Sequence, residues 1–509
     1  MAINMTFVDF VTPVPADWLN NVNTVVNNQT TFPVVTSINA LRNVTKTNHS
    51  TVFVAGYYGI GDGGGGNYFL NLADTTSADN GGTIIVANDG GRWYLQWFGQ
   101  VSVLQFGVKA DAGVTDNSTT LANCAAWVAT GAIQNKLFFP AGIYGYSISP
   151  NWAIQNATIE AYGEVRLRYS GIGNAVILDT GPTINTFTYN VNMGGTSGFI
   201  VEAPSTAGHG VYVRSVHHSK LRFKVEGAGV AKDGIRVEFA VCTNFDNCSV
   251  TANEAGAWFS TTPPLNGLHL TQRNTGEQTS YCKMDNLVCE GLSATGGAGI
   301  LLESTIGNNF YGGTSEACYY GILTGTSSSW NKFFGMDMES NTQNDIFDQG
   351  AHNEFHSCDT ATSVFISGVA LWPHFVGGNH QLITIGSGAR YASFTNVVVH
   401  RVTGTGGFTN NEPTSIFTNC FDAQSQTIVP LTQGTISTPA SGGTYTNNTG
   451  NTQIISIVPN GATISAVTIT RNAVNNNLAT ATTQVTLKPQ DGLTLTYTVA
   501  TPQLYFYSE

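Results

Sequence analysis

The sequence has little charge and few basic residues. Asp, Glu, Lys and Arg make up only 10% of the 509 residues, and 20 Lys and Arg face 32 Asp and Glu, for a net charge of −12. Nucleic-acid binding needs clustered Lys and Arg, so this balance argues against a nucleic-acid partner. No apolar run reaches the length of a membrane span, which argues against membrane insertion. The N-terminus has no basic stretch followed by an apolar core, so we expect no signal peptide.

Paired-cysteine motifs are also missing. The eight cysteines include no C-x-x-C pair. In a chain without a signal peptide, buried free thiols are expected in preference to disulfides. Four convergent ligands would be needed for zinc, and the spacing does not offer them. We therefore expect neither a metal nor a cofactor. The cysteines are Cys124, Cys242, Cys248, Cys282, Cys289, Cys318, Cys358 and Cys420.

Glycine is abundant, with 57 residues, and together with many Asn, Ser and Thr residues it predicts an all-β chain rich in turns. The stretch "GIGDGGGGNYFLNL" contains a G-x-G-x-x-G at Gly61, Gly63 and Gly66. In a nucleotide site such a loop joins a strand to a helix. Here a predicted strand precedes it, but a turn-forming run and the strand-like "TIIVAN" follow. The pattern predicts a turn between strands and not a phosphate-binding loop.

An internal repeat governs the middle of the chain. Similar strand-like segments recur with a period near 22 to 24 residues, and two longer steps of 33 and 32 residues indicate loop insertions. The repeats begin at Gly210, Gly234, Gly267, Gly299, Gly321 and Asp345. A second strand follows each first one and begins at Phe245, Met284, Phe310, Phe333 and Phe355.

The second strands share an inward pattern. Counting the first residue as zero, positions three and five are apolar or small throughout, so positions zero, three and five should point inward, with a bend between zero and three. Short strands and a repeat of about 23 residues favour a parallel β-helix, whose coils bury their inner faces by stacking. A propeller, with repeats near 40 residues, fits less well. "DNSTTLANCAAWVATG" predicts a helix, N-capped by Asp116 or Asn117, that covers the first coil.

The entry to the repeats resembles a known family. "VSVLQFGVKADAGVTDNSTTLANCAAW" followed by "KLFFPAGIYGYSI" is similar to the start of the pectate-lyase-like β-helices, in the form common in bacteriophage tailspikes. "DFVTPVPADWLNNVNTVVN" resembles the tail-attachment leader of phage tail proteins. The run from "VFVAGYYGIGDGGGGNYFLN" to "DNGGTIIVANDGGRWYLQW" resembles the β domain that precedes many spike β-helices. The glycine loop would then be a turn in a virion-proximal domain.

The resemblance implies a fold and a domain order. The fold would be all-β, with a right-handed parallel β-helix between two smaller domains. Residues 1–100 would form the virion-binding or tail-attachment domain, and residues 101–425 the β-helix, with its capping helix at about 116–130. After about 426 the sequence alternates apolar and polar residues with turns, which predicts an antiparallel β-sandwich at 426–509. Trimerisation or carbohydrate binding is the usual role at that place.

The resemblance also implies partners and a location. We expect a homotrimer attached through its N-terminal domain to phage tail or adaptor proteins, as a virion tail component made in the host cytoplasm. Its target at the host cell surface would be capsular polysaccharide or lipopolysaccharide. Three functions stay open: a depolymerase, acting as glycoside hydrolase or polysaccharide lyase; a receptor-binding fibre that only adheres; and a structural tail component without glycan affinity.

Acidic residues in the second strands are the candidate catalytic groups. Position six carries Glu290, Glu316 and Glu339, and position four carries Asp337 and Asp359. Strands of adjacent coils lie about 4.8 Å apart, and glycosidases use carboxyl pairs about 5 Å or about 6.5–9.5 Å apart. Glu316, Glu339 and Asp337 are the preferred candidates, since a loop insertion makes the placement of Glu290 less certain. The alternative is that these glutamates accept backbone N–H bonds at a turn.

An aromatic column lies at position one of the same strands. Tyr311, Phe334 and His356 should point outward on successive coils. Exposed aromatic rings can stack on sugars, so we predict these three as glycan-binding residues. The same column could instead be a seam between the chains of a trimer, and the sequence leaves both interpretations open.

Overall fold

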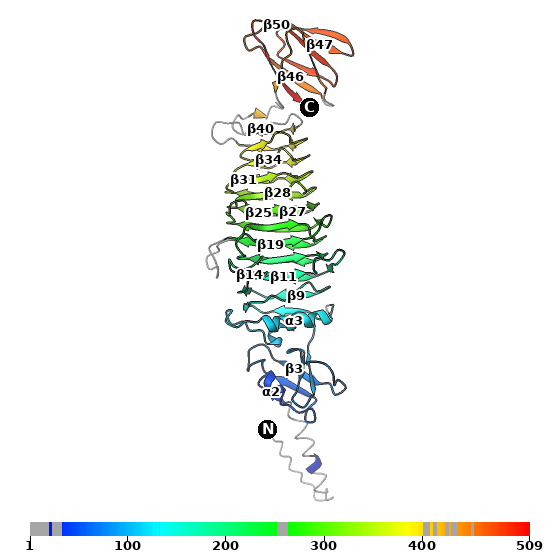
Figure 1. Ribbon diagram of the computed structural model, residues 1–509, viewed down its shortest axis with the longest axis vertical. Helices are drawn as coiled ribbons and strands as arrows, with labels where there is room; N and C mark the ends of the chain where they lie inside the picture. Colours follow the sequence, from blue (N-terminus) through cyan, green and yellow to red (C-terminus); the bar gives the residue numbers. More distant parts are fainter. Residues whose placement is uncertain are drawn as a thin grey trace, which may run out of the picture.

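The computed structural model describes residues 20–22, 33–131, 133–251, 263–400, 408–410, 415–422, 427–428, 435–448 and 452–508. These residues form a long stack of strands with a small β domain at one end and antiparallel sheets at the other (Figure 1). The all-β prediction is confirmed. Most of the predicted tail-attachment leader lies outside the described residues. None of the helices in the described ranges could serve as a membrane span.

The N-terminal domain is one five-stranded sheet in the order β1-β2-β3-β5-β4. Its strands are β1 (Val34–Val35), β2 (Thr51–Val54), β3 (Gly66–Leu70), β4 (Ile84–Val86) and β5 (Arg92–Gln96), with the short helix α2 (Ile38–Leu41). The glycine loop joins β2 to β3, which pair antiparallel. Gly61 and Gly63 have left-handed φ angles of 84° and 80°, which suit a glycine turn. The prediction of a turn between strands is confirmed.

A cap closes the first coil of the β-helix. It consists of the 3₁₀ helix η1 (Val103–Phe106) and helix α3 (Ser118–Thr130). The buried face of α3 includes Leu121, Cys124 and Val128, at the helical spacing that the sequence predicts. Asn117 is the N-cap residue, but its side chain holds the neighbouring loop by accepting from the Lys109 N–H at 2.8 Å. The helix therefore covers the coil edge as expected.

The body is a parallel β-helix. One set of first strands forms a ten-stranded sheet, and two further strands of each coil form a 24-stranded sheet, counted over the described residues. The ten strands are β11 (Val176–Asp179), β15 (Val211–Arg214), β19 (Asp233–Glu238), β22 (Asn266–Thr271), β25 (Ala298–Leu302), β28 (Tyr320–Thr324), β31 (Asn344–Asp348), β34 (Val364–Ile366), β37 (Ile383–Ile385) and β40 (Phe408–Asn410). We call the outward side of this ten-stranded sheet the first face.

The 24-stranded sheet carries two strands in most coils. Its strands are β6 (Val101–Ser102), β7 (Leu137–Phe139), β8 (Gly142–Tyr146), β9 (Thr158–Ala161), β10 (Val165–Tyr169), β13 (Asn192–Gly194), β14 (Phe199–Glu202), β17 (Lys220–Leu221), β18 (Phe223–Val225), β20 (Asn244–Asp246), β21 (Ser249–Thr251), β24 (Lys283–Glu290), β27 (Asn309–Glu316), β29 (Lys332–Phe334), β30 (Asp337–Glu339), β32 (Glu354–His356), β33 (Asp359–Thr360), β35 (His374–Val376), β36 (Asn379–His380), β38 (Ser393–Thr395), β39 (Val398–Val399), β41 (Ile416–Thr418), β42 (Phe421–Asp422) and β43 (Thr427–Ile428). Short pairs of β12 (Thr188–Tyr189) with β16 (Val216–His217) and of β23 (Thr279–Ser280) with β26 (Thr305–Ile306) lie at a corner between the two sheets.

The predicted register is confirmed. The residue after each predicted repeat start pairs, in parallel, with its equivalent in the next coil, from Val211 through to Ile346. The parallel pairing rules out a propeller. Part of the first predicted insertion, residues 252–262, lies outside the described residues. The second appears as two loops at 272–278 and 291–297.

The inward columns also follow the prediction. Positions zero and five of the second strands are buried, and the bend falls at position two, where the backbone is left-handed. The residues at the bend are Asn247, Asn286, Gly312, Gly335, Ser357, Gly377 and Asn396. Inside the helix, a column of phenylalanines stacks with ring centroids 4.5–5.2 Å apart, namely Phe310, Phe333, Phe355, Phe375, Phe394 and Phe417.

The thiols are free, as the sequence predicts, and seven of the eight are buried. Cys242 is exposed, which differs from the expectation that all would be interior. Its backbone is left-handed, with φ 51°, at a corner turn of the coil. The remaining cysteines fill the interior with small, weakly polar side chains.

The C-terminal part is an antiparallel β-sandwich. One sheet holds β44 (Thr435–Ile436), β51 (Gln503–Ser508), β46 (Gln453–Val458) and β49 (Gln484–Leu487). The other holds β45 (Thr444–Thr446), β50 (Gly492–Thr498), β47 (Thr463–Arg471) and β48 (Val474–Leu478). Both sheets contribute to one apolar core, separate from that of the β-helix, which confirms the predicted sandwich.

Candidate functional site

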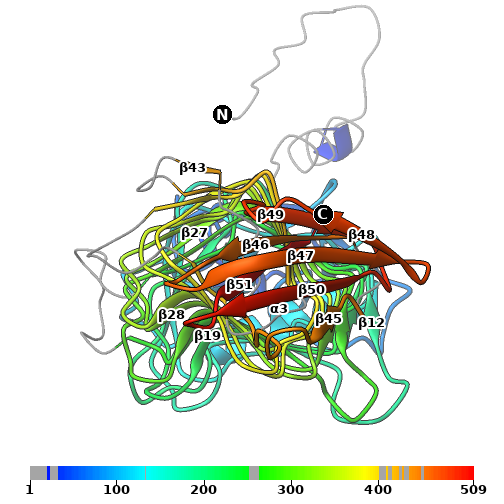
Figure 2. The same ribbon diagram turned by 90° about the horizontal axis from the view of Figure 1, so that it is seen from above.

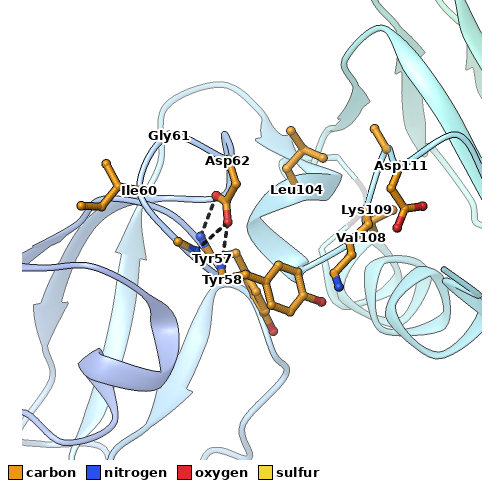
Figure 3. Close-up of a pocket in the computed structure, with 11 residues that line it drawn as sticks. Tyr57, Tyr58, Ile60, Gly61, Asp62, Leu104, Val108, Lys109 and Asp111 are labelled. Carbon is orange, nitrogen blue, oxygen red and sulfur yellow. Dashed lines mark hydrogen bonds between the residues drawn. The ribbon is translucent and has the colours of Figure 1, made fainter. Parts of the chain in front are cut away.

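The glycine loop is filled by its own acidic residue. The carboxylate of Asp62 accepts hydrogen bonds from the backbone N–H groups of Tyr57 (2.8 Å), Tyr58 (2.7 Å), Gly59 (3.0 Å) and Gly64 (2.9 Å). Burial raises the pKa of Asp62, but these four donors outweigh burial and hold the pKa below its usual value. Figure 3 shows Asp62 turned into the loop beside a hollow of about 620 Å³. A bound phosphate would have to displace this carboxylate.

The predicted acidic ladder is in register. Glu290 pairs with Glu316, and Glu316 pairs with Glu339, on β24, β27 and β30. Asp337 pairs with Asp359 of the next coil. These side chains are half-buried or exposed, and among the described residues no group donates a hydrogen bond to the carboxylates of Glu290, Glu316 or Glu339. The structure therefore brings the glutamates together on adjacent coils, and their role in catalysis stays a prediction.

The predicted aromatic column is also in place. Tyr311, Phe334 and His356 lie on successive coils, with ring centroids 5.0 Å and 4.8 Å apart and rings tilted by 6° and 19°. Because the rings stack on one another along the helix axis, their edges face outward. The ammonium of Lys283 also lies over the ring of Tyr311, 5.2 Å from the ring centroid. Sugar binding by this column stays a prediction.

A third group of residues lines a groove on the first face. The groove has a volume of about 1120 Å³ and lies across β11, β15, β19, β22 and the segment after β25. Its polar side chains carry both signs of charge: Asp179, His209, Arg214, Lys232, Asp233, Arg236, Glu238, His269 and Glu303, together with Tyr212 and Asn266. We call it the groove.

The centre of the groove is a histidine held between two carboxylates. Nδ1 of His269 lies 3.1 Å from Asp233 Oδ2, and Nε2 lies 2.9 Å from Glu303 Oε2. Burial lowers the pKa of His269, but the two carboxylates outweigh burial and raise it. The two carboxylates thus favour the charged ring, whose two N–H groups can donate to them, and Arg236 Nη1 also lies 3.0 Å from Nδ1.

The two carboxylates are themselves held ionised. Burial raises the pKa of Asp233, but hydrogen bonds from His269 and from Asn266 (2.7 Å) outweigh burial and lower the pKa to about 2. The hydrogen bond from His269 lowers the pKa of Glu303. Asp233 is buried, whereas the side chain of Glu303 is half-exposed, with 54% of its surface open. Glu303 is thus the ionised carboxylate that a ligand in the groove can reach.

A second carboxylate lies two coils away in the same column. Glu238 is the register partner of Thr271, and Glu303 lies one coil further, directly after the paired Leu270 and Leu302. Two coil steps separate their backbones by roughly 9.6 Å. Glu238 accepts hydrogen bonds from Arg236 Nε at 2.7 Å and from the Tyr212 hydroxyl at 2.6 Å.

His209 completes the groove as a neutral donor. Burial lowers the pKa of His209 to about 4. Its Nδ1 accepts the backbone N–H of Asp233 at 3.0 Å, so in the neutral ring the proton lies on Nε2. The ring stacks on Tyr212, with centroids 5.8 Å apart. The groove therefore offers fixed donors and acceptors in several directions, which suits a ligand rich in hydroxyl groups.

The groove has a recognisable feature in the sequence, but the repeat pattern alone does not show what that feature means. Tyr212, Arg236 and His269 occupy the outward position of three consecutive first strands, in "GVYV", "GIRV" and "GLHL". Outward polar residues are ordinary on a surface. What marks these three is that bulky hydrogen-bonding side chains recur at one register position. No cluster of three or more His, Cys, Asp or Glu in the described chain is arranged to hold a metal ion.

Comparison with known proteins identifies the N-terminal domain. Residues 34–97 match the small four-stranded β-sheet domain of phage tail proteins. A 186-residue stretch is 30% identical to the Mu-like prophage FluMu defective tail fibre protein of Haemophilus influenzae, covering 35% of this chain and 29% of that protein. The chain thus matches less than a third of the length of this curated relative.

Solved tailspike structures are similar along almost the whole chain. The tailspike of Acinetobacter baumannii phage AM24 aligns with a TM-score of 0.48 at 12% identity, over 96% of this chain and 95% of that one. A tailspike of A. baumannii bacteriophage Fri1, described as a capsular polysaccharide depolymerase, aligns with a TM-score of 0.44 at 12% identity, over 94% and 97%. At these values the likeness says nothing about what this chain binds or cleaves. Residues 34–97 thus match a phage tail domain, and part of the chain is similar to a phage tail fibre protein.

Proposed function

We propose that this protein is a phage tailspike that binds and cleaves a host surface polysaccharide, capsule or lipopolysaccharide, in the groove. The supporting observation is the column of Glu238 and Glu303 with Thr271 between them. Inverting glycosidases hold two carboxyl groups about 6.5–9.5 Å apart, with room for a water molecule between them and the sugar. A backbone separation of roughly 9.6 Å over two coils is compatible with that spacing.

The surroundings give each carboxyl a role. Glu303 is kept ionised by His269, so it acts as the base that activates water. Glu238 is the second carboxyl; because Arg236 and Tyr212 donate to it, it must first take up a proton, which it then gives to the departing sugar oxygen. Arg214, Arg236 and His209 contribute N–H donors that orient sugar hydroxyl or carboxylate groups in the groove.

The other two domains would hold the β-helix on the phage tail and in the trimer. The N-terminal domain would attach the protein to the tail or to an adaptor protein, and three chains would associate as a homotrimer. The sandwich would serve trimerisation or carbohydrate binding. An adhesive function without cleavage is the second candidate, because both proposed catalytic carboxyls already have partners, Arg236 for Glu238 and His269 for Glu303.

The test is cleavage of polysaccharide purified from the host strain. Reducing ends without absorbance of unsaturated uronates indicate hydrolysis, both signals indicate a lyase, and binding without either indicates adhesion. Glu303→Gln and Glu238→Gln should each lower cleavage by at least about 100-fold while binding is kept.

Matched controls lie on the acidic ladder. Glu316→Gln and Glu339→Gln make the same chemical change on another surface of the helix and should leave cleavage unchanged. Loss of cleavage in the ladder variants alone would move the active site to Glu316 and Glu339.

A further inference from the structure

An aromatic ridge follows one corner of the β-helix. At this corner the residues Ser329, Ala351, Leu371 and Arg390 form bridges from coil to coil. The residue after each bridge is aromatic or imidazole and points outward along a single column. The aromatic ridge consists of Trp330, His352, Trp372 and Tyr391.

The backbone of the ridge is left-handed. The φ angles are 60° at Trp330, 55° at His352, 51° at Trp372 and 60° at Tyr391. Bulky side chains seldom adopt this conformation, which glycine and asparagine tolerate best. Strained backbone of this kind is concentrated at functional positions in proteins.

The corner itself does not require aromatic residues. Earlier coils carry a mixture of residues with left-handed φ angles at the same corner, namely Asn190, His218, Cys242, Tyr281 and Gly307. The left-handed bend at position two of the second strands uses only Asn, Gly or Ser from Asn247 to Asn396. Four consecutive coils therefore keep a large ring at a position where asparagine or glycine would fit the backbone better.

The geometry of the stack favours contact with protein over contact with sugar. Ring centroids are 4.0 Å apart between Trp330 and His352, 4.8 Å between His352 and Trp372, and 5.0 Å between Trp372 and Tyr391. The rings are within 4–13° of parallel. Their flat faces cover one another, so the ridge presents edges outward. Sugars stack on ring faces, whereas aromatic edges pack well against side chains of another protein surface.

The exposed apolar area is of the right order for a subunit contact. Trp330, Trp372 and Tyr391 are 49%, 44% and 43% exposed. With about 150–250 Å² per aromatic side chain, the ridge leaves roughly 300–400 Å² open, against about 800 Å² per partner in a standard interface. The strand beside the ridge extends the surface: Lys332 and Glu354 pair with each other at 2.9 Å, and the outer column of Phe334 and His356 follows.

The ridge and the groove lie on different sides of the coil. The groove lies on the first face, with β19, whereas the ridge continues the corner that begins at β12 and β16; Figure 2 shows β19 and β12 well apart when the helix is viewed along its axis. Burial of the ridge leaves the groove open to a polysaccharide.

We propose that the aromatic ridge is buried against other copies of this chain and forms the apolar centre of the contact between β-helices in the trimer. This rests on the trimer of the proposed function and assigns the surface that holds it. The net charge of −12 on each copy opposes association, and burial of the apolar ridge would offset that repulsion.

The first test measures the mass of the full chain in solution. The wild-type protein should show three times the 54.0 kDa of one chain. Trp330→Ser combined with Trp372→Ser should raise the concentration at which the assembly dissociates by about 100-fold or more. The control pair is Tyr162→Ser with Ile148→Ser, two exposed apolar residues on early coils away from the ridge, and should change that concentration less than about threefold.

The outcomes separate the two proposals. A wild-type protein that is a single chain overturns the trimer and the ridge contact together. A trimeric wild-type protein whose ridge variant stays trimeric at the same dilution overturns the ridge contact only.

A second measurement does not depend on the stability of the double variant. Trp372→Cys in a Cys242→Ser background places one accessible thiol on the ridge, since the other seven cysteines are buried. In the assembled protein this thiol should resist a maleimide reagent, and adding Trp330→Ser should expose it. Ile148→Cys should react in both. Rapid labelling of Trp372→Cys in a protein with the mass of three chains, or protection that appears only when polysaccharide is added, overturns the proposal.

Discussion

The early and late coils of the β-helix have the same interior and different exteriors. On the first face the early coils carry Tyr212, Arg236 and His269, whereas the equivalent positions of later coils carry Leu301, Leu323, Phe347 and Phe365. At the corner between the sheets, the mixed residues of the early coils give way to the aromatic ridge. Both surfaces change within the coils between about 270 and 330. Stacking thus fixes the inner columns in every coil and leaves the outer columns free to specialise.

The largest effect on stability is expected from a substitution in the interior that all coils share. Phe333→Ala removes a fully buried ring from the phenylalanine column and should lower the free energy of unfolding by about 3–5 kcal/mol. Phe334→Ala, the adjacent outward residue, should cost about 1 kcal/mol or less in dissociated chains. Denaturant unfolding of both variants measures the contrast. Equal losses would show that inner and outer columns contribute alike.

Two buried histidines, one in the early coils and one in the late coils, should respond to pH in opposite directions. Burial lowers the pKa of His380, in the late coils, to about 4, so its contribution is complete above the unfolded pKa of about 6.5 and is lost as pH falls toward 4. The loss is about 3 kcal/mol. His269, in the early coils, has a raised pKa, so its contribution is complete below about pH 6.5 and is lost as pH rises through the folded pKa.

Substitution separates these contributions. His380→Gln should flatten the decline in stability between pH 6.5 and 4, and His269→Gln should destabilise the protein more at pH 5.5 than at pH 8.5. Thermal unfolding across that range is the measurement. Parallel pH profiles for the two variants would contradict the opposite signs.

Asp233 should matter more than an acidic residue on the late coils. Asp233→Asn weakens charged hydrogen bonds with His269 and Arg236 and should cost about 2 kcal/mol at pH 7. Asp337→Asn, at an exposed position, should stay within about 0.5 kcal/mol. Because the folded pKa of Asp233 is about 2, its contribution is complete above the unfolded pKa of about 3.8 and is lost as pH falls toward 2. A cost for Asp233→Asn that persists at pH 2 would contradict this assignment.

The smallest effect concerns the acidic ladder. Glu316→Gln removes one of three like charges on adjacent coils and should leave stability unchanged or raise it by a few tenths of a kcal/mol. A fall in the melting temperature would contradict the like-charge repulsion that we assign to this column.

The repeat could be predicted because its determinants are local. The start of each coil, the bend at position two and the inward residues of the second strands all recur at a fixed spacing, so a one-dimensional pattern gives the stacking register. Helix α3 and the sandwich follow from equally local periodicities. The glycine loop was interpretable as a turn, but the capture of its N–H groups by Asp62 was not.

The groove could not be predicted in the same way. His209, Asp233, His269 and Glu303 lie 24, 36 and 34 residues apart in sequence, and only coil stacking brings them into contact. Their pKa values depend on burial and on partners in other coils, which no repeat pattern shows. The ridge had a usable signal, since Trp330, His352, Trp372 and Tyr391 recur at intervals of 22, 20 and 19 residues, but its left-handed backbone appears only in three dimensions.

The two ends of the stack determine how long the spike can be. Every coil presents the same unpaired row of N–H and C=O groups to the next one. Parallel stacking therefore does not by itself limit the number of coils, and an uncovered end could pair with further coils or with another molecule. Helix α3 ends this growth on the first coil. At the far end β43 pairs with β42 in the opposite direction, Phe421 with Ile428 and Asp422 with Thr427, so the next layer is no longer a template for a parallel coil. Segments of the same chain therefore close both ends of the stack and set the number of coils.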